Sequence, residues 1–171
     1  MHPGLNDIRL LLLDVDGVLT DGGITYSDSG EQIKTFHSRD GFGLRLLMDS
    51  GIRVGIITGR VSKALRHRCD NLGITLLCDG AKDKAAALEK IILETGIPAG
   101  NIAFVGDDLM DLPVMKKVGV SFCVADAAEE VKQYSRMVTT RGGGRGAVRE
   151  ICESILKAKG LWENIRNQYL S

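Results

Sequence analysis

Two carboxylates separated by one residue directly follow an apolar run near the start of the chain. Leucines occupy positions 10–13, and Asp14, Val15, Asp16 and Gly17 come next. Because alternate residues of a strand point to the same face, Asp14 and Asp16 are predicted to point the same way. At the carboxyl end of a parallel strand, such a pair can hold a divalent cation and attack a group bound to it. A strand ending in an Asp-Gly turn gives the same residues, so this stretch alone leaves both interpretations open.

Further polar groups stand after three later apolar runs. They are Thr58 with Gly59 and Arg60, Lys84 after Asp83, and Asp107 with Asp108 and Asp111. Taken singly, Thr58 is typical of a helix N-cap and Lys84 of a solvated helix residue. Taken together, a hydroxyl, an ammonium and carboxylates at successive strand ends predict one set of groups around a divalent cation.

Alternating apolar runs and helix-like segments predict the elements that position these groups. Strands are expected at residues 10–14, 53–57, 75–78, 102–105 and 121–124. Helices are expected at residues 41–50, 62–72, 82–95, 109–118, 127–134 and 147–157. Strands that alternate with helices indicate an α/β fold, a doubly wound parallel sheet covered on both faces.

One insertion interrupts this alternation after the first strand. Residues 24–26 and 32–36 flank the turn-forming sequence Ser27-Asp28-Ser29-Gly30, which predicts a β-hairpin within an insertion of about residues 22–37. An isolated pair of strands is marginal in water, so the hairpin is expected to pack on something. Residues 1–171 are expected to form one domain, ending in a tail of about residues 158–171.

Composition limits the classes of partner. The chain has 22 Lys and Arg against 22 Asp and Glu, so its net charge gives no support for a nucleic-acid or membrane partner. No run reaches the roughly 20 apolar residues of a membrane span, and residues 1–9 lack a signal-peptide pattern, so a cytoplasmic location is expected. The four cysteines are widely spaced and are expected to be small buried thiols.

The joint pattern resembles the haloacid dehalogenase superfamily. Its four motifs, Asp-x-Asp-Gly, Thr or Ser, Lys, and Gly-Asp-x-x-x-Asp, match this chain in order. The resemblance implies a Rossmann-like fold and a phosphatase in which Asp14 becomes phosphorylated and Asp16 acts as acid and base. It also implies Mg²⁺ held by the Asp14 and Asp107 carboxylates and the Asp16 backbone carbonyl, with Thr58 and Lys84 on the phosphate. Asp108 and Asp111 would support the ligands from behind.

Further motifs narrow the resemblance to the capless subgroup that hydrolyses 3-deoxy-D-manno-octulosonate 8-phosphate (KDO 8-phosphate). They are Thr20-Asp21-Gly22, Phe36-x-x-Arg39-Asp40-Gly41, Thr58-Gly59-Arg60 and the run from Gly143 to Glu150. The subgroup implies a role in lipopolysaccharide precursor synthesis. It also implies a homotetramer assembled through the hairpins, with each active site partly covered by a neighbouring subunit and no separate cap domain.

The second anionic group of such a substrate, a sugar-acid carboxylate, requires a second cationic site. Arg60 and Arg145 are the candidates, because guanidinium pairs bidentately with planar carboxylates. Gly59 and Gly144 are candidates for close backbone contact with the substrate, although the glycine run could equally be a flexible loop.

Three alternatives remain open. A phosphatase for another keto-deoxy sugar acid, such as a nine-carbon 9-phosphate, would use the same chemistry. A non-catalytic assembly module of the same fold would not need the complete acid set. A receiver domain shares the phosphorylatable Asp, Thr or Ser, and Lys, but places its acidic residues in a different order.

Overall fold

A computed structural model describes residues 4–170 and contains one parallel six-stranded sheet. In spatial order the strands are β5 (Leu76–Cys78), β4 (Arg53–Ile57), β1 (Leu10–Leu13), β6 (Ile102–Gly106), β7 (Val120–Cys123) and β8 (Met137–Val138). Leu13 lies opposite both Ile56 of β4 and Val105 of β6. The order reverses beside β1, because the chain first adds β4 and β5 on one side and then β6 on the other. Ligands of open α/β sheets bind at such a reversal, beyond the carboxyl ends of the strands.

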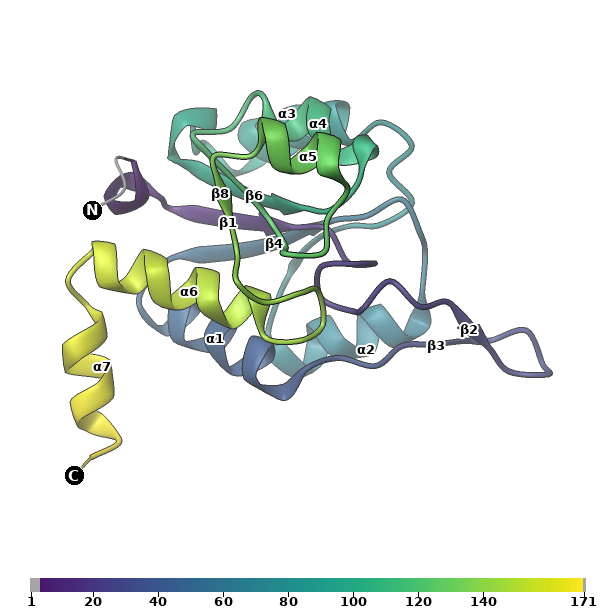
Figure 1. Cartoon of the computed structure of the whole chain (residues 1–171), viewed down its shortest axis with the longest axis horizontal. Coiled ribbons are helices and arrows are strands. Elements are labelled where there is room, and N and C mark those ends of the chain that lie inside the picture. The colour runs from purple at the N-terminus through teal and green to yellow at the C-terminus, as the bar shows by residue number, and fades with distance from the viewer. Residues whose placement is uncertain (1–3, 171) are drawn as a thin grey trace.

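Helices cover both faces of the sheet, as the sequence predicts (Figure 1). One face carries α1 (Ser38–Asp49), α2 (Lys63–Leu72) and α6 (Ala147–Ala158), and the other carries α3 (Lys84–Thr95), α4 (Leu112–Met115) and α5 (Glu129–Tyr134). The four leucines of β1 are fully buried between these layers. The predicted α/β class is confirmed. No helix within residues 4–170 is both long and apolar enough to cross a bilayer.

The predicted hairpin is present as β2 (Thr25–Tyr26) paired antiparallel with β3 (Gln32–Ile33). It projects away from the body of the molecule (Figure 1). Its strands are shorter than the sequence suggested. Residues 14–37, which join β1 to α1, contain this hairpin and no cap domain.

Several element boundaries differ from the prediction. The helix expected at residues 109–118 is a 3₁₀ turn, Leu109–Asp111, followed by the four-residue α4, because Asp108 and Asp111 form a capping box there. Helix α1 begins at Ser38, three residues early, since Gly41 and Gly43 allow close packing against Arg68 and α6 instead of breaking the helix.

Four short elements were not predicted. They are β8, two 3₁₀ turns at Leu5–Asp7 and Ala99–Asn101, and a helix α7 (Trp162–Gln168) in the predicted tail. Arg149 of α6 stacks on the Trp162 ring at 5.5 Å and on the Phe42 ring at 5.2 Å. These contacts attach α7 to the body of the protein.

A glycine-rich segment, residues 142–146, packs directly on the loop that follows β1, and we call it the glycine loop. The Gly143 N–H donates to Asp126 Oδ1 at 2.8 Å, and the Gly144 N–H donates to the Val18 carbonyl at 3.0 Å. A Cβ on Gly143 would lie 1.8 Å from the Gly17 carbonyl oxygen. The loop is therefore an ordered packing element, and only glycine fits at position 143.

We expect Gly143→Ala to lower the free energy of unfolding by about 1–3 kcal/mol, the usual cost of overpacking a site that cannot move easily. Gly100→Ala is the matched control, because a Cβ there meets no atom within 4 Å. Its effect should stay within about 0.5 kcal/mol. Urea unfolding of both variants measures the difference, and equal stability of the two would contradict this account of the glycine loop.

Candidate active site

All but two of the predicted site residues line one cleft of about 330 Å³ at the carboxyl ends of β1, β4 and β6. We call it the acidic cleft. Its lining consists of Asp14, Asp16, Thr58, Gly59, Arg60, Lys84, Asp107, Asp108, Met110 and Asp111. Residues from four separate parts of the sequence are thus brought together where the strand order reverses.

Asp14 and Asp16 both face the acidic cleft, although not as residues of a regular strand. Strand β1 ends at Leu13, and Asp14 is held beside β6 by its N–H, which donates to the Val105 carbonyl at 3.0 Å. Asp16 lies in the turn that follows. Gly17 continues this turn with a φ of 89°, and a Cβ there would lie 2.0 Å from Asp107 Oδ2. The turn therefore requires glycine both for its conformation and for its approach to Asp107.

One buried ammonium lies between two carboxylates in the acidic cleft. Lys84 Nζ is 2.8 Å from Asp14 Oδ1 and 2.7 Å from Asp111 Oδ1. Asp83 caps α3 by accepting from the Ala86 N–H at 2.9 Å, and Lys84 is the first residue of that helix. Lys82, the other lysine of this segment, is exposed. The surface-lysine interpretation of Lys84 is therefore wrong.

Asp111 is fully buried, and both of its oxygens have partners. Oδ1 accepts from Lys84, while Oδ2 accepts the backbone N–H groups of Asp107 at 2.9 Å and Asp108 at 3.2 Å. These bonds fix the backbone that carries the Asp107 carboxylate. The support that Asp111 is expected to give the metal ligands stays a prediction, and Asp108 serves as the cap of the 3₁₀ turn.

The carboxylates carry more negative charge than Lys84 can offset. Burial, with the negative charges of Asp14, Asp111 and Asp108, raises the pKa of Asp107 to about 8. Burial and the charge of Asp111 raise the pKa of Asp14 to about 6, although Lys84 opposes the shift. Such shifts indicate that the ionised cluster lacks a positive charge.

The donor set fits a hard divalent cation. One carboxylate oxygen from each of Asp14, Asp107 and Asp111 lies within 4.8 Å of the others. Because the Asp111 oxygens are already hydrogen-bonded, Asp14 and Asp107 are the carboxylates best placed to bind a cation. Oxygen-only ligands favour Mg²⁺ over softer metals.

Thr58 directly follows β4 and lines the acidic cleft, with only 2% of the residue exposed. The N-cap interpretation of Thr58 is wrong, because Ser62 caps α2 by accepting from the Leu65 N–H at 3.4 Å. The Thr58 hydroxyl accepts from the Arg60 N–H at 3.5 Å. Arg60, two residues later, lies at the cleft rim with half of its side chain exposed.

Gly144 and Arg145 do not line the acidic cleft of this chain. The Gly144 N–H donates to the Val18 carbonyl, and the exposed Arg145 pairs with Asp21 at 3.1 Å. Their predicted contact with substrate stays a prediction, and it would require a change of the Arg145 side chain or a neighbouring subunit.

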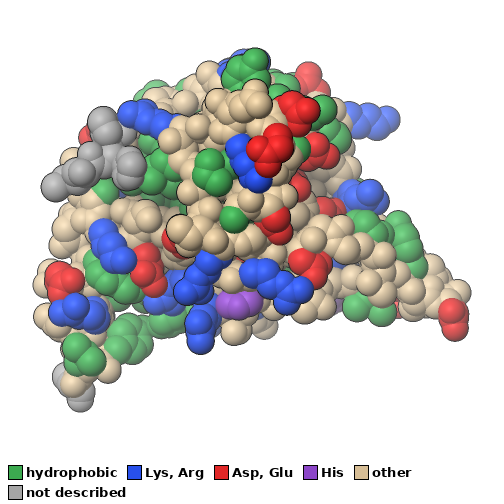
Figure 2. Space-filling view, viewed as in Figure 1, with side chains coloured by type: hydrophobic (Ala, Val, Ile, Leu, Met, Phe, Trp, Pro, Cys, Tyr) green, Lys and Arg blue, Asp and Glu red, His purple; other side chains and the backbone are tan. Residues whose placement is uncertain are grey.

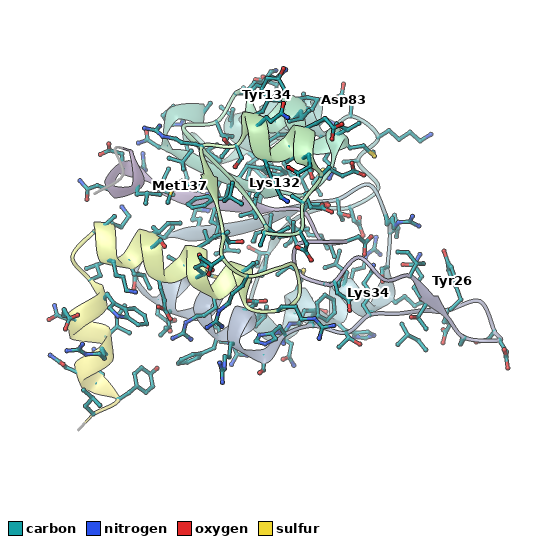
Figure 3. All side chains as sticks on the ribbon, in the orientation of Figure 1. Tyr26, Lys34, Asp83, Lys132, Tyr134 and Met137 are labelled. Atoms are coloured by element: carbon teal, nitrogen blue, oxygen red, sulfur yellow. The ribbon has the colours of Figure 1, made fainter. Side chains whose placement is uncertain are left out.

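Lys34, for which no role was predicted, contacts Asp16 Oδ1 through its ammonium. Lys34 follows β3 and reaches back from the hairpin toward the body (Figure 3). In the sequence, Lys34 is a single lysine next to Ile33 in a segment that alternates apolar and polar residues. Such lysines are common in surface strands and do not mark a site. Met110, half-exposed at the cleft mouth, was also missed.

Comparisons with known proteins agree with this geometry. A family model of haloacid dehalogenase-like hydrolases matches residues 77–150. The 3-deoxy-D-manno-octulosonate 8-phosphate phosphatase KdsC of Escherichia coli (strain K12) is 48% identical over 162 residues, which cover 95% of this chain and 86% of that protein.

Two solved structures extend the match to the fold. The crystal structure of the 3-deoxy-D-manno-octulosonate 8-phosphate phosphatase from Yersinia pestis is 46% identical with a TM-score of 0.92, covering 94% of this chain and 86% of that one. The enzyme from Moraxella catarrhalis, in complex with magnesium, phosphate and KDO, is 39% identical with a TM-score of 0.95, covering 97% and 95%. With this identity over nearly its whole length, and with the carboxylates, Thr58 and Lys84 gathered in one cleft, the chain belongs to the 3-deoxy-D-manno-octulosonate 8-phosphate phosphatase family of haloacid dehalogenase-like hydrolases.

Proposed function

We propose that this chain is a Mg²⁺-dependent phosphatase that hydrolyses KDO 8-phosphate to KDO and inorganic phosphate through an aspartyl-phosphate on Asp14. The observation that carries the proposal is the buried triad of Asp14, Lys84 and Asp111 beside Asp107 in one cleft. Family membership supports the substrate, because the Moraxella catarrhalis relative holds magnesium, phosphate and KDO together.

The residues that would hold Mg²⁺ are Asp14 and Asp107 through their carboxylates and Asp16 through its backbone carbonyl. When bound, the ion offsets negative charge, so that an anionic nucleophile can approach an anionic phosphate. Lys84 adds a second positive charge that is built into the protein. Asp111 orients Lys84 and fixes the backbone of Asp107.

In the first step, an Asp14 carboxylate oxygen attacks phosphorus, and the bond from phosphorus to the sugar oxygen breaks. Asp16 donates its proton to the departing sugar oxygen, which releases KDO and leaves phospho-Asp14. The Thr58 hydroxyl donates to a phosphoryl oxygen, and the Lys84 ammonium offsets charge on that group. This contribution is positioned electrostatics, which is usually the largest part of phosphoryl-transfer catalysis.

In the second step, Asp16 takes a proton from water as the water oxygen attacks the phosphorus of phospho-Asp14. The bond from phosphorus to the Asp14 oxygen breaks, so that inorganic phosphate leaves and both carboxyl groups return to their starting states. Dividing one difficult displacement into two easier ones is the advantage of a covalent intermediate.

Arg60 is proposed to pair with the carboxylate of the sugar acid, since it lies at the rim of the acidic cleft. Gly59 beside it lets the substrate approach the backbone closely. Gly144 and Arg145 are proposed to contribute across a subunit boundary, because this chain does not place them in its own cleft.

The substrate proposal predicts a specific pattern of phosphate release. With Mg²⁺, KDO 8-phosphate should be hydrolysed far faster than its nine-carbon 9-phosphate analogue or common hexose phosphates, and excess chelator should remove the activity. Restoring Mg²⁺ after chelation is the control. Equal rates across the panel would contradict the proposed substrate but not the proposed phosphatase mechanism. Absence of any phosphate release would favour the assembly-module alternative.

Asp14→Asn should lose more than about 10³-fold in kcat, because an amide cannot be the nucleophile of this reaction. The fold should persist, since the substituted side chain has the same shape. Asp49→Asn, at an exposed position at the end of α1, is the matched control and should keep full activity. A variant that retained a tenth of the turnover would show that Asp14 is not the nucleophile.

We also propose a homotetramer assembled through the hairpins. Ile24, Tyr26 and Ile33 are 39%, 55% and 54% exposed, and Figure 2 shows hydrophobic side chains along the projection. A two-stranded pair that holds exposed apolar side chains gains stability by packing on other copies. Each acidic cleft would then be partly covered by a neighbouring subunit.

Ile33→Asp should convert the tetramer to smaller species, because it places a charge in the proposed interface. Leu93→Asp is the matched control, since Leu93 is 84% exposed on α3, away from the hairpin. Light scattering after size-exclusion chromatography reports the mass of each variant. A tetramer that survives Ile33→Asp, or that dissociates equally with Leu93→Asp, would contradict assembly through the hairpin.

We place the reaction in the cytoplasm, within lipopolysaccharide precursor synthesis, and infer that residues 1–171 act as one domain. The four cysteines are free thiols, the state that a reducing compartment maintains. The substrate is a small sugar-acid phosphate, and neither nucleic acid nor membrane is part of the proposal.

A further inference from the structure

Lys34 is the one side chain of the hairpin whose charged group reaches the acidic cleft residues. Its side chain is only 3% exposed, whereas neighbouring Ile33 and nearby Tyr26 are more than half exposed. Figure 3 shows Lys34 at the base of the hairpin, where the hairpin meets the body. Burying an ammonium requires a specific partner, and here the partner is the Asp16 carboxylate.

Asp16 is bracketed by two cations that differ in how firmly they are held. Lys34 Nζ contacts Oδ1, and Arg60 Nε lies 3.4 Å from Oδ2. The Arg60 side chain is 51% exposed and is free to turn toward an anionic substrate. The Lys34 side chain is buried and directly follows the paired strand β3, so Lys34 is the fixed partner of Asp16.

Lys34 contacts Asp16 from outside the acidic cleft. It is absent from the residues that line the cleft, although Asp16 and Arg60 are among them. A substrate in the cleft would therefore meet the Asp16 carboxylate before it met the Lys34 ammonium. This arrangement favours a role through Asp16 over direct contact with the substrate.

We propose that Lys34 is a positioning residue that holds Oδ1 of Asp16, so that Oδ2 faces the reacting oxygen when Arg60 turns to the substrate. The inference rests on the proposed function, because it takes Asp16 as the acid and base. Proton transfer requires the carboxylate within hydrogen-bond reach of the reacting oxygen, and small displacements of positioned groups cost large factors in rate. The hairpin then contributes directly to the alignment of the active site.

The first test compares Lys34→Met with Lys34→Arg in the full-length protein with Mg²⁺ and KDO 8-phosphate. Lys34→Met should lower kcat by about 10- to 100-fold with KM changed less than about threefold, a part of the factor that acid–base catalysis supplies. Lys34→Arg, which keeps the cation, should remain within about threefold of wild type in kcat. A tenfold rise in KM with unchanged kcat would instead assign Lys34 to direct substrate binding and overturn the proposal, as would wild-type kinetics.

Lys117→Met is the matched control for the loss of one ammonium from one carboxylate. Lys117 Nζ lies 2.8 Å from Glu89 Oε1, and neither residue lines the acidic cleft. Its kinetics should equal those of wild type. Thermal unfolding with and without Mg²⁺ should show that all three variants fold and gain stability from the ion, which separates misfolding from misalignment.

A double-mutant cycle tests whether Lys34 acts through Asp16. Asp16→Asn should reduce turnover strongly, and adding Lys34→Met to it should cost less than about threefold more, because residues that act as a unit are not additive. If the second substitution repeats its full effect in the Asp16→Asn background, Lys34 acts elsewhere and the proposal fails.

Failure of the proposed function gives a different result. A wild-type protein that ignores KDO 8-phosphate but releases phosphate from another ester would overturn the substrate alone, and the same cycle on that ester would still decide the role of Lys34. A wild-type protein inactive toward every ester would overturn both proposals together.

Discussion

The structure depends on one electrostatic constraint, the gathering of several carboxylates around a single buried ammonium. Asp14, Asp107 and Asp111 place oxygens within 4.8 Å of one another, and Lys84 pairs with two of the three residues. In a folded chain without bound cations, this crowding is unfavourable, as the raised pKa values of Asp14 and Asp107 indicate. The fold must therefore hold the carboxylates in place with its own packing, so that the missing charge comes from the metal ion.

The sheet and its glycines provide that packing. The fully buried β1 places Asp14 between β4 and β6, and the reversal of strand order beside β1 brings Thr58 and Asp107 to the same edge. Gly17 lets the turn after β1 approach Asp107 where a Cβ would collide with its carboxylate. The glycine loop then closes on that same turn through backbone contacts. Backbone segments at the site thus pack directly against each other, without side chains between them.

The sequence predicted the parts of this site that depend on local pattern. Asp14, Thr58 and Asp107 each follow an apolar strand, and strand ends of a parallel sheet must meet at one edge. The helix caps were harder to predict, because a single hydrogen bond decides which residue is the cap. Ser62 caps α2 and Asp83 caps α3, whereas Thr58 and Lys84 line the cleft. The short α4 was mispredicted because Asp111 turns inward to bind backbone N–H groups, a tertiary contact that periodicity does not encode.

Lys34 lay beyond prediction for a further reason, which links the hairpin to the chemistry. The sequence of a hairpin does not show which of its two faces will lie against the rest of the protein. Only the packing of the hairpin on the body decides which side chains reach the active site. Here, Ile33 points to solvent and the next residue reaches Asp16. The face offered to other copies and the cation offered to the active site therefore belong to the same two-stranded unit. If the hairpins pack together, the packing that fixes their orientation also fixes the Lys34 ammonium that holds Asp16. Assembly of the subunits and proton transfer by Asp16 would then both depend on the position of the hairpin.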